Sequence, residues 1–125
     1  MGVLEDAAAH LRKAREYIAA ADDDLAMERF NAAASAAVHS GINSKDAICL
    51  KLTGRTGKAD RHEDAVAELR GVGATAAQLA PTLSRLIKIK KRAEYQASDV
   101  APTDARKAVD WAQRLLDGAV AIVGG

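Results

Sequence analysis

The stretch PTDARKAVDWAQRLLDGAVAIV, residues 102–123, carries the clearest helical pattern in a chain of 125 residues. Apolar residues recur in it at every third or fourth position, which places them on one face of a helix. They are Ala105, Ala108, Val109, Ala112, Leu116, Ala119 and Val123. Pro102 suits the first turn of a helix, where a residue without an N–H loses no hydrogen bond. We therefore expect an amphipathic helix that begins at Pro102 and packs its alanine-rich face against other helices.

The same spacing predicts helices along the rest of the chain. A first helix should run from Leu4 until the acidic run Asp22–Asp24, which we expect to start a second helix because carboxylates stabilise the positive end of a helix dipole. Gly41 should end that second helix, and Asn43–Ser44 should cap a short helix after it. Further helix starts are indicated by capping boxes at Asp60–Glu63 and Thr75–Gln78 and by Pro81.

The composition excludes several classes of protein. Hydrophobic residues make up 49% of the chain and aromatic residues 3%, while 18 basic residues nearly balance 17 acidic ones. Such a chain is too apolar to be disordered, too poor in aromatic residues for a β-sandwich, and too neutral to attract nucleic acid with its whole surface. We predict an all-α fold with a single domain, residues 1–125. It should be an antiparallel, up-and-down bundle of about four long helices with short connecting helices.

The sequence also indicates a compartment. Cys49 is the only cysteine, so an intrachain disulfide is excluded. Residues 1–6 lack the cationic and apolar segments of a signal peptide. No apolar run approaches the ~20 residues that are needed to span a bilayer. We therefore expect a cytoplasmic protein that does not associate with membranes.

Cofactor and metal sites find little support in the motifs. The loop Gly54–Ala59 has two glycines and a lysine but lacks the spacing and the following hydroxyl of a P-loop. His10, His39 and His62 are far apart in the sequence, and none has a metal-ligand spacing to Cys49. We predict no cofactor and no metal.

The segment Arg85–Arg92 concentrates five cations in eight residues of one predicted helix. Such a run is either a solvated helix face or a stripe that contacts phosphates, in which case RNA affinity would fall steeply with salt. The candidate basic patch consists of Arg85, Lys88 and Lys91.

Polar residues interrupt two otherwise apolar stretches. Asp46 stands beside Ala47–Cys49, and Lys90 and Tyr95 lie around Ala93. A carboxylate and an ammonium that face the same interior must pair, because an unpaired buried charge is too costly. Such a pair is either architectural or part of an active polar centre.

The helix of residues 102–123 carries a second apolar ridge. Trp111, Leu115 and Ile122 lie, with Gly118, roughly 80–120° around the helix from its main stripe. Either these residues widen the core face, or they form the interface of a homodimer.

Several short motifs follow one another along the chain in an order similar to that of a known protein family. They are His39–Cys49, Asp60–His62, Ala65–Val66, Leu86–Lys90, Ala93–Tyr95, Val100–Ala101, Ala105–Ala108 and Trp111–Leu115. Over residues 3–123 this order resembles the HEPN family, most closely its small stand-alone bacterial members. The resemblance implies a helical bundle, commonly dimeric, that acts on RNA or binds nucleotides. Many members of that family are toxins or defence ribonucleases that work with an antitoxin partner.

The resemblance also implies where catalysis would reside. Catalytic members carry an Arg followed within a few residues by a His on a late helix, and a dimer joins two such motifs into a metal-independent ribonuclease site. Here Arg92 is followed by Glu94 and Tyr95, and no histidine comes later. Arg55 and His62 have a similar spacing but lie in the central connection.

The leading interpretation is a module that binds RNA, a nucleotide or a protein partner through a polar centre without cleaving RNA. The predicted centre contains Asp46, His62, Lys90, Arg92 and Tyr95. One alternative is a ribonuclease toxin in which Arg92 acts with a displaced histidine, His62 or His39. A second alternative is a structural or antitoxin-like subunit that recognises protein through the ridge around Trp111.

Overall fold

The computed structural model describes residues 2–57 and 62–124, except for the side chains of His62 and Glu63. These residues form four long helices and two short ones, and they contain no strand. The helices are α1 (Val3–Ala26), α2 (Phe30–Thr53), α3 (His62–Arg70), α4 (Ala74–Ala77), α5 (Ala80–Tyr95) and α6 (Pro102–Val123). The prediction of an all-α bundle with about four long helices is confirmed.

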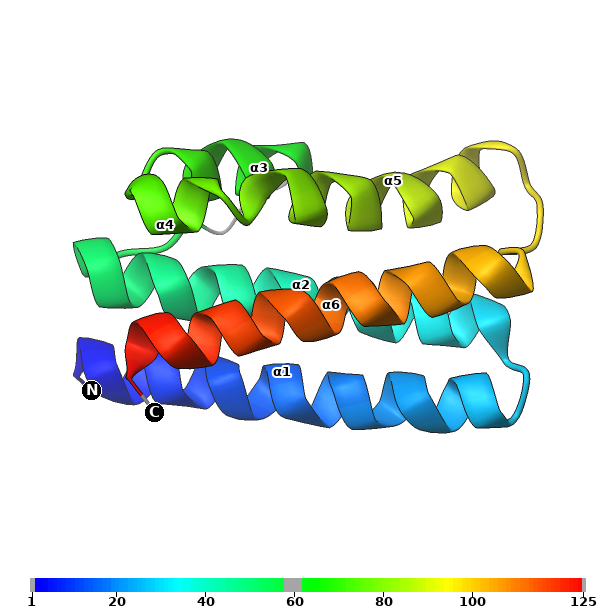
Figure 1. The fold of residues 1–125 in the computed structure, drawn as a ribbon, viewed down its shortest axis with the longest axis horizontal. Coiled ribbons are helices and arrows are strands. Elements are labelled where there is room, and N and C mark those ends of the chain that lie inside the picture. Colours follow the sequence, from blue (N-terminus) through cyan, green and yellow to red (C-terminus); the bar gives the residue numbers. More distant parts are fainter. Residues whose placement is uncertain (1, 58–61, 125) are drawn as a thin grey trace.

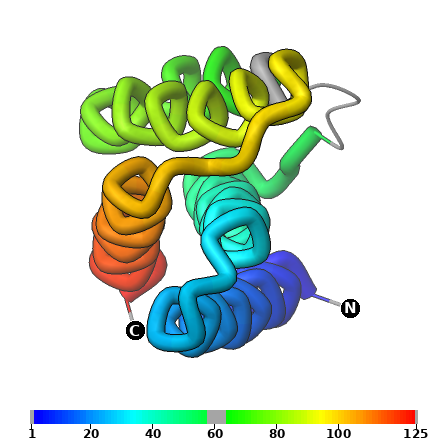
Figure 2. Tube along the Cα trace, turned by 90° about the vertical axis from the view of Figure 1, so that its right-hand side faces the viewer, coloured from blue at the N-terminus to red at the C-terminus, as the bar shows by residue number. Residues whose placement is uncertain are grey.

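The helices are stacked in layers around α2. Helix α1 forms the lower layer, α2 and α6 the middle, and α5 with the short α3 and α4 the upper layer (Figure 1). Seen end on, α2 lies between α1 and α5 with α6 beside it (Figure 2). Helix α2 contacts α1, α3, α5 and α6. Within the described residues, no helix has both the length and the apolar character that crossing a membrane requires.

Helix α2 passes through the centre of the bundle without a break, so the prediction that it ends at Gly41 is wrong. A Cβ atom at Gly41 would lie 2.7 Å from Cδ2 of Leu86 on α5 and 3.2 Å from Cδ1 of Leu115 on α6. The glycine therefore serves the close approach of three helices, and it costs the helix only about 1 kcal/mol of propensity. Consequently Asn43–Ser44 lies inside α2 and caps no helix.

The connection between α1 and α2 also lies later in the sequence than predicted. Helix α1 continues through Asp22–Asp24 to Ala26, and α2 starts at Phe30. The carboxylates therefore lie at the negative end of α1, where the dipole disfavours them. Arg29 compensates in part, because its Nε donates to Oδ1 of Asp24 over 2.9 Å. The N-capping preference of aspartate was overridden by the packing of α1 against α2.

Other predicted boundaries have mixed outcomes. Pro81 and Pro102 lie in the first turns of α5 and α6, as predicted, and Gly54 ends α2 with a left-handed φ of 78°. The prediction that Thr75–Gln78 forms a capping box is wrong, because α4 begins at Ala74 and its N-cap residue is Gly73. The predicted box at Asp60–Glu63 lies outside the residues and side chains that the structure describes.

We predict that Gly41→Val lowers the free energy of unfolding by about 2 kcal/mol, because the added methyl groups overpack a site bounded by three leucine side chains. Urea denaturation measures this change. The control is Ala32→Val on the exposed face of the same helix, which should cost only the ~0.5 kcal/mol helix propensity of valine. Equal losses in the two variants would contradict the close approach at Gly41.

Candidate functional site

Helix α2 buries a lysine that the sequence interpretation did not single out. The side chain of Lys45 is 1% exposed and forms an ion pair with the neighbouring Asp46. Its Nζ also donates to Oγ1 of Thr56 over 3.1 Å, to the carbonyl of Gly57 over 3.4 Å and to Oε1 of Glu68 over 3.2 Å. We refer to these five residues as the lysine cluster. Two carboxylates and two further oxygens thus surround one buried ammonium, as a buried charge requires.

The lysine cluster fastens α3 and the chain after α2 to α2 itself. Oγ1 of Thr56 lies 2.6 Å from Oδ1 of Asp46 and 3.0 Å from Oε1 of Glu68. The N–H of Gly57 donates to both carboxylate oxygens of Glu68, each at 3.0 Å. A Cβ at Gly57 would collide with that carboxylate. A larger residue at position 57 would therefore force the Glu68 carboxylate to move from the position in which it reaches Lys45.

The surroundings of Lys45 and Glu68 stabilise the charged forms of both side chains. Burial alone would lower the pKa of Lys45, but hydrogen bonds and attraction to Asp46 and Glu68 outweigh it and raise the pKa above 10.5. Burial would likewise raise the pKa of Glu68, yet hydrogen bonds from Gly57, Cys49 and Lys45 bring it below 4.5. Burial and the hydrogen bond to Glu68 raise the pKa of Cys49 to about 12.

These pKa directions determine what the cluster can do chemically. A nucleophilic lysine must lose its proton and a reactive cysteine must form a thiolate, and the surroundings of Lys45 and Cys49 oppose both changes. His10 of α1 lies at the edge of the cluster, with its Nδ1 2.9 Å from Oδ1 of Asn43 and 3.8 Å from Oδ2 of Asp46. The lysine cluster is thus built to hold helices together.

A second group of polar residues lies at the opposite end of the bundle. There the segment 96–101, which we call the strap, joins α5 to α6 and runs past the N-terminus of α2. The side chain of Asn31 fixes the strap, since its Nδ2 donates to Oδ1 of Asp99 over 3.0 Å and its Oδ1 accepts the N–H of Val100 over 2.8 Å. Among the described residues, the non-glycine residues with positive φ are Glu28 (58°) and Ala97 (50°), and both belong to this end.

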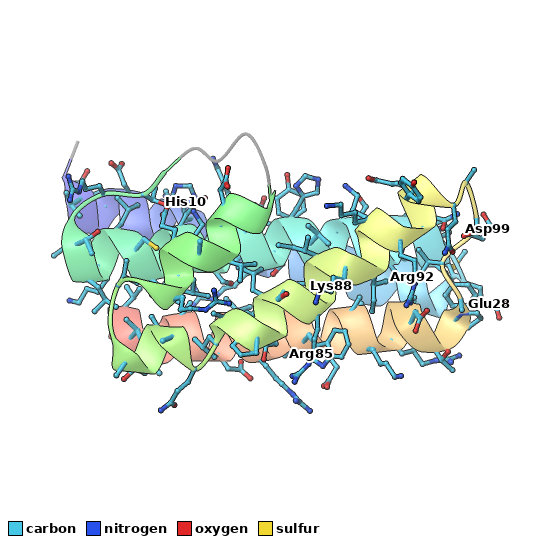
Figure 3. The ribbon with its side chains drawn as sticks, turned by 90° about the horizontal axis from the view of Figure 1, so that it is seen from above. His10, Glu28, Arg85, Lys88, Arg92 and Asp99 are labelled. Carbon is cyan, nitrogen blue, oxygen red and sulfur yellow. The ribbon has the colours of Figure 1, made fainter. Side chains whose placement is uncertain are left out.

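Open hollows surround the strap. The one between α2 and α5, which we call the α2–α5 pocket, has a volume of about 400 Å³. It is lined by Asn31, Ser35, Lys90, Ala93, Glu94, Ser98 and Val100. A smaller hollow of about 200 Å³ lies between α5 and α6 and includes Arg92 and Asp104. Figure 3 shows Glu28, Arg92 and Asp99 gathered at this end, with His10 at the other end.

The structure does not bring the predicted polar centre together. Asp46 pairs with Lys45 in the lysine cluster, whereas Lys90 lines the α2–α5 pocket beside Asn31 and Ser35. Ser35 precedes Asp46 by eleven positions on α2, which corresponds to about 16 Å along the helix axis. The expectation that a buried carboxylate must find an ammonium holds for Asp46, but its partner is Lys45 and not Lys90.

The other members of the predicted centre also have separate surroundings. Nζ of Lys90 lies 3.4 Å from Oε1 of Glu94, and Nη2 of Arg92 donates to Oδ2 of Asp104 on α6 over 2.9 Å. Tyr95 is 91% exposed at the end of α5. The side chain of His62 is not among those that the structure describes.

The histidine proposed as a displaced catalytic partner is also placed elsewhere. The ring of His39 on α2 stacks on Tyr17 of α1, with 5.1 Å between ring centroids. Arg92 lies on α5 and pairs with α6. The structure therefore does not bring Arg92 and His39 together. In the described part of the chain, no three His, Cys, Asp or Glu side chains gather closely enough to hold a metal ion.

The ridge predicted as a dimer interface is largely part of the core. Leu115 is 0% exposed, so it is not available to a second copy of the chain. Trp111 and Ile122 are half-buried and pack against the same core. A Cβ at Gly118 would lie 2.7 Å from Cδ1 of Leu79, so the chain itself already covers this part of α6. The ridge widens the core face, which was the other interpretation of the sequence.

The predicted basic patch is exposed. Arg85, Lys88 and Lys91 lie on the outer side of α5 at intervals of three residues, and Arg85 and Lys88 are visible along the upper surface (Figure 3). Among the side chains that the structure describes, no carboxylate forms an ion pair with Arg85 or Lys88. These two cations are available to an external anion.

No model of a known protein family matches the sequence, and no curated protein is significantly similar to it. The resemblance to the HEPN family therefore remains a hypothesis that rests on the motifs alone.

We predict that Lys45→Met lowers the free energy of unfolding by about 3 kcal/mol, because two carboxylates that share the Thr56 hydroxyl then lose their cation. The additional change Glu68→Gln should restore part of the loss. Lys51→Met, at an exposed position of the same helix, should cost under about 0.5 kcal/mol. If the buried and exposed lysines prove equivalent in urea denaturation, the lysine cluster does not stabilise the fold.

We also predict how stability depends on pH. The pKa of Glu68 is lower in the folded chain, so its contribution is present above pH 4.5 and is lost as the pH falls through the folded value. The pKa of Lys45 is raised, so its contribution is present below pH 10.5 and is lost as the pH rises through the folded value. Glu68→Gln should therefore be less stable than the natural chain at pH 7, and the difference should shrink below pH 4.5. A difference that stays constant to pH 3 would contradict this assignment.

Proposed function

We propose that the chain is a non-catalytic module that binds single-stranded RNA through the outer face of α5. The observation that carries the proposal is the exposed row of Arg85, Lys88 and Lys91, which ends beside Tyr95 with 91% of its surface exposed. Residues three apart are neighbours on a helix surface, so the three cations form one continuous row. Cations in a row can follow a phosphate backbone, and an exposed aromatic ring can stack on an unpaired base.

The distribution of charge over the bundle supports the same face. Helix α5 holds five cations and one carboxylate, whereas α1, in the opposite layer, holds three cations and six carboxylates. Although the net charge of the chain is only +1, helices α5 and α1 therefore carry net charges of opposite sign on the two outer layers. A polyanion is attracted to the upper layer and repelled by the lower one.

Binding without cleavage is favoured by the surroundings of the titratable groups. General acid–base catalysis needs a group whose pKa lies near neutrality within reach of the reacting atoms. Histidine is the side chain that most often fills this role, and helix α5, which carries the row, contains no histidine.

A cytoplasmic location and membership of the HEPN family form part of the same proposal. The resemblance also motivates tests for a homodimer and for an antitoxin-type partner.

The test measures binding of a labelled 12-nucleotide single-stranded RNA by fluorescence anisotropy at increasing salt. Arg85→Gln/Lys88→Gln should reduce affinity about tenfold and make the slope of log K against log salt shallower by about 1.4, or ~0.7 for each lost phosphate contact. Tyr95→Ala should weaken binding about fivefold through lost stacking, and Tyr95→Phe should not. The RNA should remain uncut.

The matched control removes two cations from the opposite layer. Arg12→Gln/Lys13→Gln changes the net charge equally at exposed positions of α1, and it should leave affinity within about twofold. Equal losses in the two double variants would show that only net charge matters. RNA that is not retained even at low salt would rule out the proposed function.

A further inference from the structure

The row of cations on α5 leads to the α2–α5 pocket. On an α-helix each step of three residues turns the surface position by about 60°, so a row with this interval winds around the helix. After Arg85, Lys88 and Lys91 the next position of the row is Glu94, which lines the pocket. A nucleotide chain that follows the cations is therefore led to the mouth of this pocket.

The pocket has the volume and the mixed apolar and polar lining of a site for a small ligand group. Its volume of about 400 Å³ lies within the range of ligand sites. Ala93 and Val100 provide apolar surface, while Ser35 provides a hydroxyl group. Val100 is itself buried and is fixed by its hydrogen bond to Asn31. The wall formed by the strap is thus in place before a ligand arrives.

The charged groups of the pocket define which base fits. Nζ of Lys90, a donor, lies 3.4 Å from Oε1 of Glu94, whose carboxylate only accepts hydrogen bonds. A carboxylate binds best to a group that presents two N–H donors side by side. Guanine presents such a pair, N1–H and N2–H, with the O6 acceptor next to it for a lysine. Adenine, cytosine and uracil do not present two adjacent N–H donors from different ring positions.

We propose that the α2–α5 pocket binds a guanine base of the RNA whose phosphates lie along the α5 row. Glu94 accepts hydrogen bonds from N1–H and N2–H, and Lys90 donates to O6. This inference rests on the proposed function of RNA binding, to which it adds a base preference. Ala97, whose φ is positive, directly precedes Ser98 of the pocket lining, and strained backbone often occurs at binding sites.

The test compares labelled hexamers of uridine in which one position is uridine, guanosine or inosine. Inosine lacks only the N2 amino group, so it loses one of the two hydrogen bonds to Glu94. We expect the guanosine hexamer to bind about fivefold more tightly than the inosine hexamer. Glu94→Gln should abolish this ratio. The ratio is the readout because removing a negative charge raises the affinity of every RNA.

The matched control is Asp110→Asn on α6, which removes a carboxylate of similar exposure, 61% against 65%, that also pairs with a cation four residues away. It should preserve the preference for guanosine. Ser35→Leu, which fills the pocket, should abolish the preference.

The outcomes separate the two proposals. Tight binding of all three hexamers without a preference would overturn the guanine site and leave the α5 row intact. A preference that survives Glu94→Gln would also overturn the guanine site. If no hexamer binds, both proposals fail.

Discussion

The close approach of helices around Gly41 is the constraint on which the rest of the structure depends. The chain has few aromatic residues, and much of the buried surface by which α2 contacts four other helices consists of alanines and Gly41. Short interhelical distances bury little area per residue but exclude water from a long interface. Because α2 lies at the centre, Lys45 is buried. Its ion pair with Glu68 holds α3 against α2.

The central position of α2 also determines which surfaces remain for binding. Helices α1 and α5 are pushed to opposite outer layers, and their charges have opposite signs. The lysine cluster at one end of the bundle has its hydrogen-bonding groups occupied by one another. At the other end, the strap leaves open hollows beside Lys90 and Arg92. The stabilising lysine cluster and the proposed binding site thus lie at opposite ends of the same bundle.

Helical periodicity was sufficient to predict the fold class, but not every boundary or the site. Local residue preferences predict helix boundaries at Gly41 and at Asp22–Asp24, but they do not show that Gly41 serves a contact between helices or that α1 continues through the three aspartates. The pairing of Asp46 was expected, but its partner depends on how α3 and residues 54–57 return to α2. One signal was available: Lys45 lies four residues after Gly41 and three before Ile48, and so on the same buried face. The exposed row on α5 was predictable because it is local to one helix.

The central claim is that RNA binds along α5 and at the strap end of the bundle. The most direct measurement is the change in amide chemical shifts of the ¹⁵N-labelled chain on titration with a short single-stranded RNA. The account predicts changes concentrated in residues 85–95, in the strap and around Asn31 and Ser35, with little change in α1 before residue 20 or around Lys45. Changes confined to α1 or to the lysine cluster, or none at saturating RNA, would contradict it.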